Sequence, residues 1–128
     1  MPIEVRIDKQ LGVVLRRVTG KVTTEELIAN FIETLQHPDY RPGMRSLSDL
    51  REVHPSTFSA DARKIGDFVV SRSKQTGSAR AAIVVSQDAS YGMVRVLQVF
   101  AQNSPMDIQV FRDMNEARTW LGLDEESA

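Results

Sequence analysis

Hydrophobic and polar residues change their spacing along the chain in an order typical of α/β proteins. Apolar and charged residues alternate over residues 3–8, which predicts an edge strand with one solvent-facing side. A second apolar segment, residues 13–18, predicts another strand. Because Gly12 lies in the short polar turn between them, the two strands should pair as a hairpin.

The next segment predicts a helix followed by a short strand. Thr23 and Glu26 have the spacing of a capping box, and apolar residues at helical spacing continue to Leu35 before Pro38 ends the helix. Residues 46–50 predict a short strand. Residues 51–58 have no regular pattern, so an irregular connection is expected there.

Two further strand and helix pairs are predicted in the second half. A helix capped near Ser59 should bury Ala62, Ile65, Phe68 and Val69. Its Gly66 fits either close approach of a neighbouring element or a glycine that the helix merely tolerates. The uniformly apolar residues 81–85 predict a central strand buried on both faces. Asp88 or Ser90 should cap the following helix, and residues 108–111 form the last strand.

The last two helices should each bury one apolar face. In the first, this face consists of Met93, Val96, Leu97, Phe100 and Ala101. In the second, which Asp113 caps, it consists of Ala117, Trp120 and Leu121.

Composition limits the organisation and the partners. The chain has 128 residues, of which 41% are hydrophobic, and this predicts one domain over residues 1–123 with a frayed acidic tail at 124–128. With 16 Lys and Arg against 17 Asp and Glu, no global charge attracts nucleic acid or an anionic membrane. The absence of cysteine, of a signal peptide and of a membrane-length apolar segment favours a cytoplasmic protein.

No motif in the chain carries enzyme chemistry. His37 and His54 have no partner at metal-ligand spacing, and the glycine-rich nucleotide and hydrolase motifs are missing. We therefore expect no catalytic activity, no metal and no cofactor. An enzyme that uses His54 with Asp49 or Arg51 ranks lowest among the hypotheses.

The position of several polar residues near the predicted strand ends nevertheless indicates a binding site. Ligands of open α/β sheets bind beyond the carboxyl ends of the strands, where helix N-termini present unpaired N–H groups. Near these ends the chain has a polar set without an obvious nucleophile and base. Its candidate residues are Asp49, Arg51, His54, Ser56, Thr57, Ser59, Ser90, Tyr91 and Arg112. For Asp49 and Arg51 a local ion pair is the simpler interpretation.

The segment order and several short stretches resemble the STAS fold of the SpoIIAA-like anti-sigma-factor antagonists. More specifically, the chain resembles the uncharacterised bacterial SpoIIAA-like proteins grouped with STAS and Sec14-type domains. The stretches that carry the resemblance are Gly20 with residues 22–27, residues 47–53, 80–85, 91–92 and 110–113, and the pairs Glu116-Ala117 and Trp120-Leu121.

This resemblance implies a five-stranded mixed sheet with an N-terminal hairpin, four helices gathered on one face, and an opposite face that is partly wet. It also implies a non-catalytic regulatory or protein-interaction module that acts through residues 51–59. In the antagonists, a phosphorylated serine lies in an Asp-Ser-Ser-Gly-Leu-like turn. Residues 54–61 read His-Pro-Ser-Thr-Phe-Ser-Ala-Asp instead, which departs from that pattern.

The Sec14-type relationship implies the alternative function, a carrier of a lipid or another apolar small molecule. The partner expected from the sequence is therefore a protein or an apolar small molecule, and a homodimer also fits. An apolar cavity would favour the carrier.

Overall fold

Five strands form a single mixed sheet in a computed structural model that describes residues 2–54 and 61–123. The strands follow one another across the sheet in chain order, β1-β2-β3-β4-β5. β1 and β2 are antiparallel, and every later neighbour is parallel, as predicted. The strands are β1 (Ile3–Asp8), β2 (Val13–Gly20), β3 (Arg45–Val53), β4 (Arg80–Val84) and β5 (Asp107–Phe111).

The four longer helices are the four predicted ones. They are α1 (Thr24–Gln36), α2 (Ala62–Ser71), α4 (Asp88–Phe100) and α5 (Met114–Leu121). A fifth, α3 (Ser73–Thr76), is a four-residue helix that directly follows α2. Its polar sequence has no apolar period, so the hydrophobic pattern could not indicate it.

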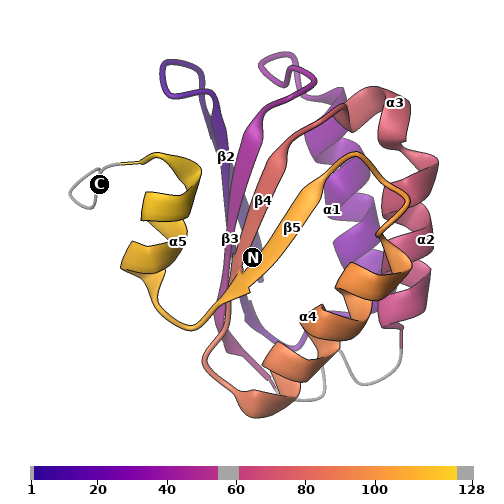
Figure 1. The fold of residues 1–128 in the computed structure, drawn as a ribbon, viewed down its shortest axis with the longest axis vertical. Helices are drawn as coiled ribbons and strands as arrows, with labels where there is room; N and C mark the ends of the chain where they lie inside the picture. Colours follow the sequence, from indigo (N-terminus) through magenta and orange to yellow (C-terminus); the bar gives the residue numbers. More distant parts are fainter. Residues whose placement is uncertain (1, 55–60, 124–128) are drawn as a thin grey trace.

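The helices cover both faces of the sheet, so the expectation that all of them gather on one face is wrong for α5. Figure 1 shows α1, α2, α3 and α4 on one side and α5 on the other. Alternation along β4 explains this arrangement. Ile83 packs with residues of α2 and α4, whereas Ala82 and Val84 form a second core with Ala117 and Leu121 of α5.

Strand β4 is buried on both faces, as its apolar sequence predicts, but β3 is the middle strand of the five. The prediction of irregular structure from residue 51 onward is wrong for the first three residues, because β3 continues to Val53. A bulge makes this possible: two steps along β2, from Arg17 to Thr19, match three steps along β3, from Asp49 to Glu52.

Side-chain caps appear at two of the predicted helix starts. The Thr23 hydroxyl accepts a hydrogen bond from the Glu26 amide, and the Glu26 carboxylate accepts one from the Thr23 amide. The Asp113 carboxylate accepts from the Glu116 amide. At α4 the prediction is wrong, because Gln87 occupies the N-cap without a side-chain bond and Ser90 is buried inside the helix.

Close packing of α2 against α4 confirms the first of the two interpretations of Gly66. A methyl group at this position would lie 2.5 Å from the Phe100 Cβ atom. The buried stripe of α4 is Ser90, Val94, Leu97 and Ala101, which differs from the predicted one. Val96 and Phe100 from that predicted stripe are exposed, because α4 is rotated to bring Ala101 and the Phe100 backbone against Gly66.

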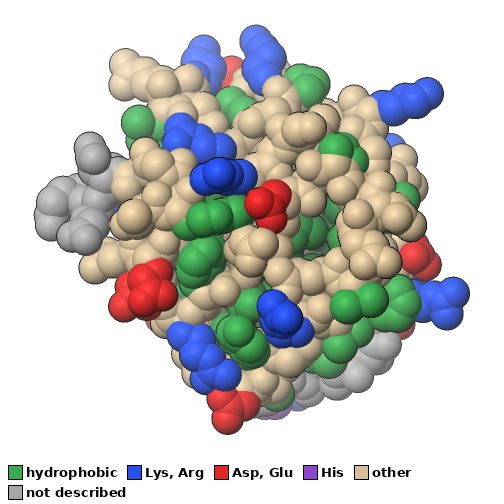
Figure 2. Space-filling model, in the orientation of Figure 1, with side chains coloured by type: hydrophobic (Ala, Val, Ile, Leu, Met, Phe, Trp, Pro, Cys, Tyr) green, Lys and Arg blue, Asp and Glu red, His purple; other side chains and the backbone are tan. Residues whose placement is uncertain are grey.

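Charges of both signs are interspersed on the face shown in Figure 2, with hydrophobic side chains showing between them. Within residues 2–54 and 61–123, no helix has the length and apolar character needed to cross a membrane. The predicted cap at Ser59 and the acidic tail at 124–128 lie outside the described residues.

Candidate functional site

A buried arginine lies on the inner face of the sheet, under α1. Val14, Arg16 and Val18 alternate along β2 and point toward the helices. Arg16 is only 6% exposed, although it is a charged residue. Fully buried arginines are rare unless they are paired, so the partners of this side chain determine its meaning.

The partners of Arg16 are neutral. Its Nε donates to Asn30 Oδ1 at 2.8 Å, one terminal nitrogen donates to Ser48 Oγ at 3.2 Å, and the other donates to Thr34 Oγ1 at 3.0 Å. The guanidinium carbon also lies 4.6 Å from the centre of the Phe31 ring. Among the described residues, no Asp or Glu forms an ion pair with Arg16.

Burial changes the protonation equilibrium of Arg16 without removing its charge at neutral pH. Desolvation lowers the pKa of Arg16 to about 10, and the nearby Tyr40 hydroxyl opposes that effect. Partial burial in turn raises the pKa of Tyr40 above its usual value. Arg16 is therefore a buried cation whose charge no described protein group neutralises, an arrangement that costs stability.

An apolar cavity of about 100 Å³ adjoins this cation between the sheet and the helices. A smaller cavity of about 50 Å³ shares Arg16, Phe31 and Ser48 with it. The larger cavity extends toward Tyr40 and Met106, which precede β3 and β5, so it reaches the amino ends of the parallel strands. The predicted site was at the opposite, carboxyl ends.

One residue that lines the larger cavity has a buried hydroxyl without a partner. Thr76 lines the cavity, is 8% exposed, and its Oγ1 forms no hydrogen bond. A buried hydroxyl without a partner is uncommon, because losing its bonds to water is not compensated. The remaining lining is mainly aliphatic and aromatic; its apolar residues include Phe31, Leu35, Ile65, Phe68, Val69 and Ile83. The cavity can therefore take an apolar molecule that carries a polar group.

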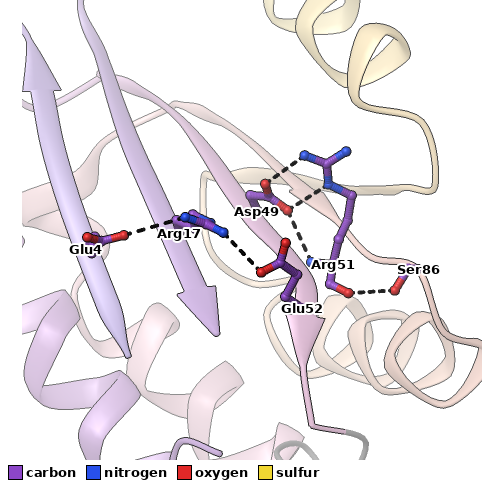
Figure 3. Close-up of polar contacts among 6 residues, drawn as sticks. All are labelled: Glu4, Arg17, Asp49, Arg51, Glu52 and Ser86. Carbon is purple, nitrogen blue, oxygen red and sulfur yellow. Dashed lines mark hydrogen bonds and ion pairs between the residues drawn. The ribbon is translucent and has the colours of Figure 1, made fainter. Parts of the chain in front are cut away.

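The predicted pair Asp49 and Arg51 exists on β3, where Asp49 lines the hollow on the α5 side of the sheet (Figure 3). Arg51 Nε and Nη2 each donate to a carboxylate oxygen of Asp49 at 2.9 Å, and the Arg51 amide donates at 3.1 Å. Partial burial of Asp49 works against ionisation, but these bonds from Arg51 outweigh it and lower the pKa of Asp49. The same bonds raise the pKa of Arg51. The pair is a local ion pair, as the simpler interpretation held.

A second ion network lies beside this pair. Arg17 on β2 contacts Glu4 on β1 and Glu52 on β3, at 3.9 and 3.0 Å (Figure 3). These three side chains are exposed, so the network links β1, β2 and β3 at the surface and contributes little to the free energy of unfolding. Beside it, an open hollow between β1, β2, β3 and α5 is lined by Val5, Leu15 and Met114.

Two predicted residues, Tyr91 and Arg112, come together at the start of α4. Arg112 contacts Asp88 at 2.7 Å and its guanidinium lies 4.7 Å from the centre of the Tyr91 ring. Ser90 is 2% exposed and faces the core. No contact between described residues joins this group to Asp49 and Arg51, so the predicted set does not form a single site.

The remaining predicted residues divide by location. His54 is exposed, and its amide donates to the Gly20 carbonyl at 2.7 Å, which closes the end of the sheet. Ser56, Thr57 and Ser59 lie outside the described residues. In the part of the chain that the structure describes, no three His, Asp or Glu side chains gather as a metal site would require.

Sequence reasoning missed the Arg16 site, although a signal was present. Arg16 shares the strand face of Val14 and Val18, where a charged residue is out of place. Asn30 and Thr34 are four residues apart on the face of α1 that also carries Leu27 and Phe31. Polar residues inside two apolar patterns that pack together could have indicated a buried polar cluster.

Comparison with known proteins agrees with this architecture. The chain matches the SpoIIAA-like family over residues 13–122. The fold is similar to the crystal structure of an uncharacterised protein from the DUF3478 family, with a SpoIIAA-like fold, from Shewanella loihica PV-4. The two chains are 21% identical with a TM-score of 0.56, and the match covers 93% of this chain and 91% of the other. No curated protein matches the chain. Because the family match spans most of the sequence, the resemblance is confirmed and the chain belongs to the SpoIIAA-like family.

Proposed function

We propose that this domain binds a small, mainly apolar molecule in the cavity around Arg16, as a non-catalytic carrier or sensor. The observation that carries the proposal is the coincidence of three features in one place: an apolar cavity, a buried cation without a counterion, and the unpartnered hydroxyl of Thr76. Convergent polar groups in an apolar pocket are the usual form of a small-molecule site.

A non-catalytic role is supported by the chemistry of the lining. The polar residues around the two cavities are arginine, serine, threonine and tyrosine, and His, Asp and Glu are absent from the described lining. The described lining therefore has none of the imidazole or carboxylate groups that most often act as the general base for a hydroxyl. Binding without reaction fits this set of groups.

The size of the cavity limits the ligand. An engineered protein cavity of roughly 150 Å³ holds benzene. The two adjoining cavities, about 100 and 50 Å³, are on the same scale. A molecule with a chain or ring of about six carbon atoms is therefore a suitable probe, whereas a full-length acyl chain would need the helices to move apart.

Calorimetric titration with hexan-1-ol tests the proposal, because this probe is apolar and uncharged. Saturable binding to the wild-type protein is expected. Ala81→Leu should abolish it, since Ala81 lines the larger cavity and the added atoms fill that space. Ala29→Leu makes the same change on an exposed surface of α1 and should bind like wild type.

Ser46→Val is the second cavity variant, in case Ala81→Leu does not fold. Saturable binding to wild type that is lost in a folded cavity variant supports the proposal. Absence of binding to wild type, or unchanged binding to every cavity variant that folds, contradicts it.

A protein-interaction role is the second proposal. One observation favours it: Val96, Val99 and Phe100 lie on one side of α4 and are 42%, 60% and 38% exposed. Sedimentation of wild type and Val99→Glu tests self-association through this side. A dimer that Val99→Glu dissociates supports the proposal, and a monomer at all concentrations removes the homodimer form of it.

A further inference from the structure

The charges that line the two cavities have one sign. Arg16 and Arg72 are part of the lining, and no described Asp or Glu is. Arg72 is half-buried, donates to Gln75 Oε1 at 3.2 Å and lies 5.1 Å from the centre of the Phe68 ring. The charged groups among these lining residues are therefore all positive, which favours an anion over a cation as the ligand.

The hydrogen-bonding capacity of Arg16 points to an acceptor. A guanidinium has five N–H donors and no acceptor. Three donors bind Asn30, Ser48 and Thr34, each through a neutral oxygen. These bonds orient the group, but among the described residues they leave two donors without an acceptor and the positive charge without a counterion, with only the Phe31 ring stacked against it.

A single carboxylate complements these features best. It accepts hydrogen bonds only, it has two oxygens in the plane that suits a guanidinium, and it carries one negative charge against the one deeply buried cation. A phosphate dianion would bury a second charge that Arg16 cannot neutralise.

We infer that the ligand of this site is a small apolar monocarboxylate whose carboxylate group binds the Arg16 guanidinium. This inference rests on the proposed function and adds the chemical class of the ligand. Its apolar part would occupy the space lined by Ile65, Phe68 and Ile83.

Calorimetric titration at pH 7 with hexanoate and hexanamide tests the inference. The two probes have nearly the same shape, and hexanoate alone is charged at this pH. Wild type should bind hexanoate about tenfold or more tightly than hexanamide, because a charge-assisted bond is stronger than a neutral one. Arg16→Met should lose this preference and still bind hexanamide.

Arg17→Met is the matched control. Arg17 is the next residue of β2, and its side chain points to the opposite face, where it contacts Glu52. This variant removes the same charge and should keep the wild-type preference. If Arg16→Met does not fold, Arg16→Lys replaces it, because it keeps the charge but loses the planar pair of donors, and it should show a clearly smaller preference.

The outcomes separate the two claims. A hexanoate preference that depends on Arg16 and not on Arg17 supports the inference. Equal binding of both probes to wild type overturns the inference and leaves the proposed function standing. A preference that survives in Arg16→Met also overturns it. Binding of neither probe overturns the inference, and if hexan-1-ol does not bind either, the proposed function is overturned as well.

Discussion

Gly66 of α2 and Phe100 of α4 lie so close that a methyl group at position 66 would stand 2.5 Å from the Phe100 Cβ and 3.0 Å from its carbonyl carbon. The second contact is to backbone, so rotation of the phenyl ring cannot relieve it. These two helices and the sheet beneath them enclose the cavities described above, and Leu97 of α4 lines both. The glycine thus sets the distance between the helices over the proposed site.

Gly66→Ala should destabilise the domain. Alanine is favoured over glycine in a helix by roughly 1 kcal/mol, but overpacking typically costs about 1–3 kcal/mol. With a backbone atom at 3.0 Å we expect overpacking to win, with a net loss of about 1–2 kcal/mol. Urea denaturation of both proteins gives the difference in free energy of unfolding.

Gly92→Ala is the control for this prediction. Gly92 is in the middle of α4, and a methyl group there would meet nothing within 4 Å. The free energy of unfolding should rise by up to about 1 kcal/mol. A stabilised Gly66→Ala protein would show that α2 and α4 are not in close contact.

Arg16→Met should change the free energy of unfolding by less than about 2 kcal/mol, because two effects oppose each other. The substitution removes a buried cation without a counterion, which favours the variant, but it also takes a hydrogen-bond donor from Asn30, Thr34 and Ser48, which costs stability. Thermal and urea denaturation measure the effect, with Arg17→Met as an exposed control that should change stability by less than about 1 kcal/mol. A loss of more than about 2 kcal/mol in Arg16→Met would make Arg16 a structural residue.

Arg51→Met should raise the pKa of Asp49, because it removes the bonds that hold this pKa below its usual value. A carboxyl group with a lowered folded-state pKa adds stability above its unfolded pKa, near 3.9, and this contribution is lost as the pH falls through the folded value. Wild type should therefore lose stability on acidification below about pH 5 more steeply than the variant.

NMR titration of the Asp49 carboxyl carbon checks the pKa directly, and urea denaturation between pH 3 and 6 checks the slope. Since Asp49 is partly exposed, the difference between the two stability curves should stay below about 1 kcal/mol. An unchanged Asp49 pKa in Arg51→Met would contradict the account of this pair.

The fold could be predicted from the sequence where local pattern and packing agree. Three predicted features depend only on residues close in sequence, and the structure has them all. They are the alternation in β1, the apolar strand β4 and the caps at Thr23 and Asp113. The side of the sheet that α5 covers could not be predicted. The apolar residues at helical spacing in α5 show that one face of this helix is buried, but they do not show which face of the sheet it packs on. Strand β4 is apolar on both faces, so α5 could pack on either one.

The candidate site depends on contacts that local pattern does not contain. Arg16 bonds to residues 14, 18 and 32 positions away, on α1 and β3. A charged residue in a half-buried strand usually faces water, and only the assembled fold shows that this one does not. The general rule for α/β sheets predicts a ligand at the carboxyl ends of the strands. The larger cavity lies at their amino ends instead.

Methyl NMR of the labelled wild-type protein during titration with hexan-1-ol tests the central claim most directly, because it reports where the probe binds. We predict saturable shifts at Ile65 and Ile83, which line both cavities, and no shifts at Leu15 and Leu47, which lie on the α5 side of the sheet. Shifts on the α5 side alone, or none that saturate, would contradict the claim that the space around Arg16 is a ligand site.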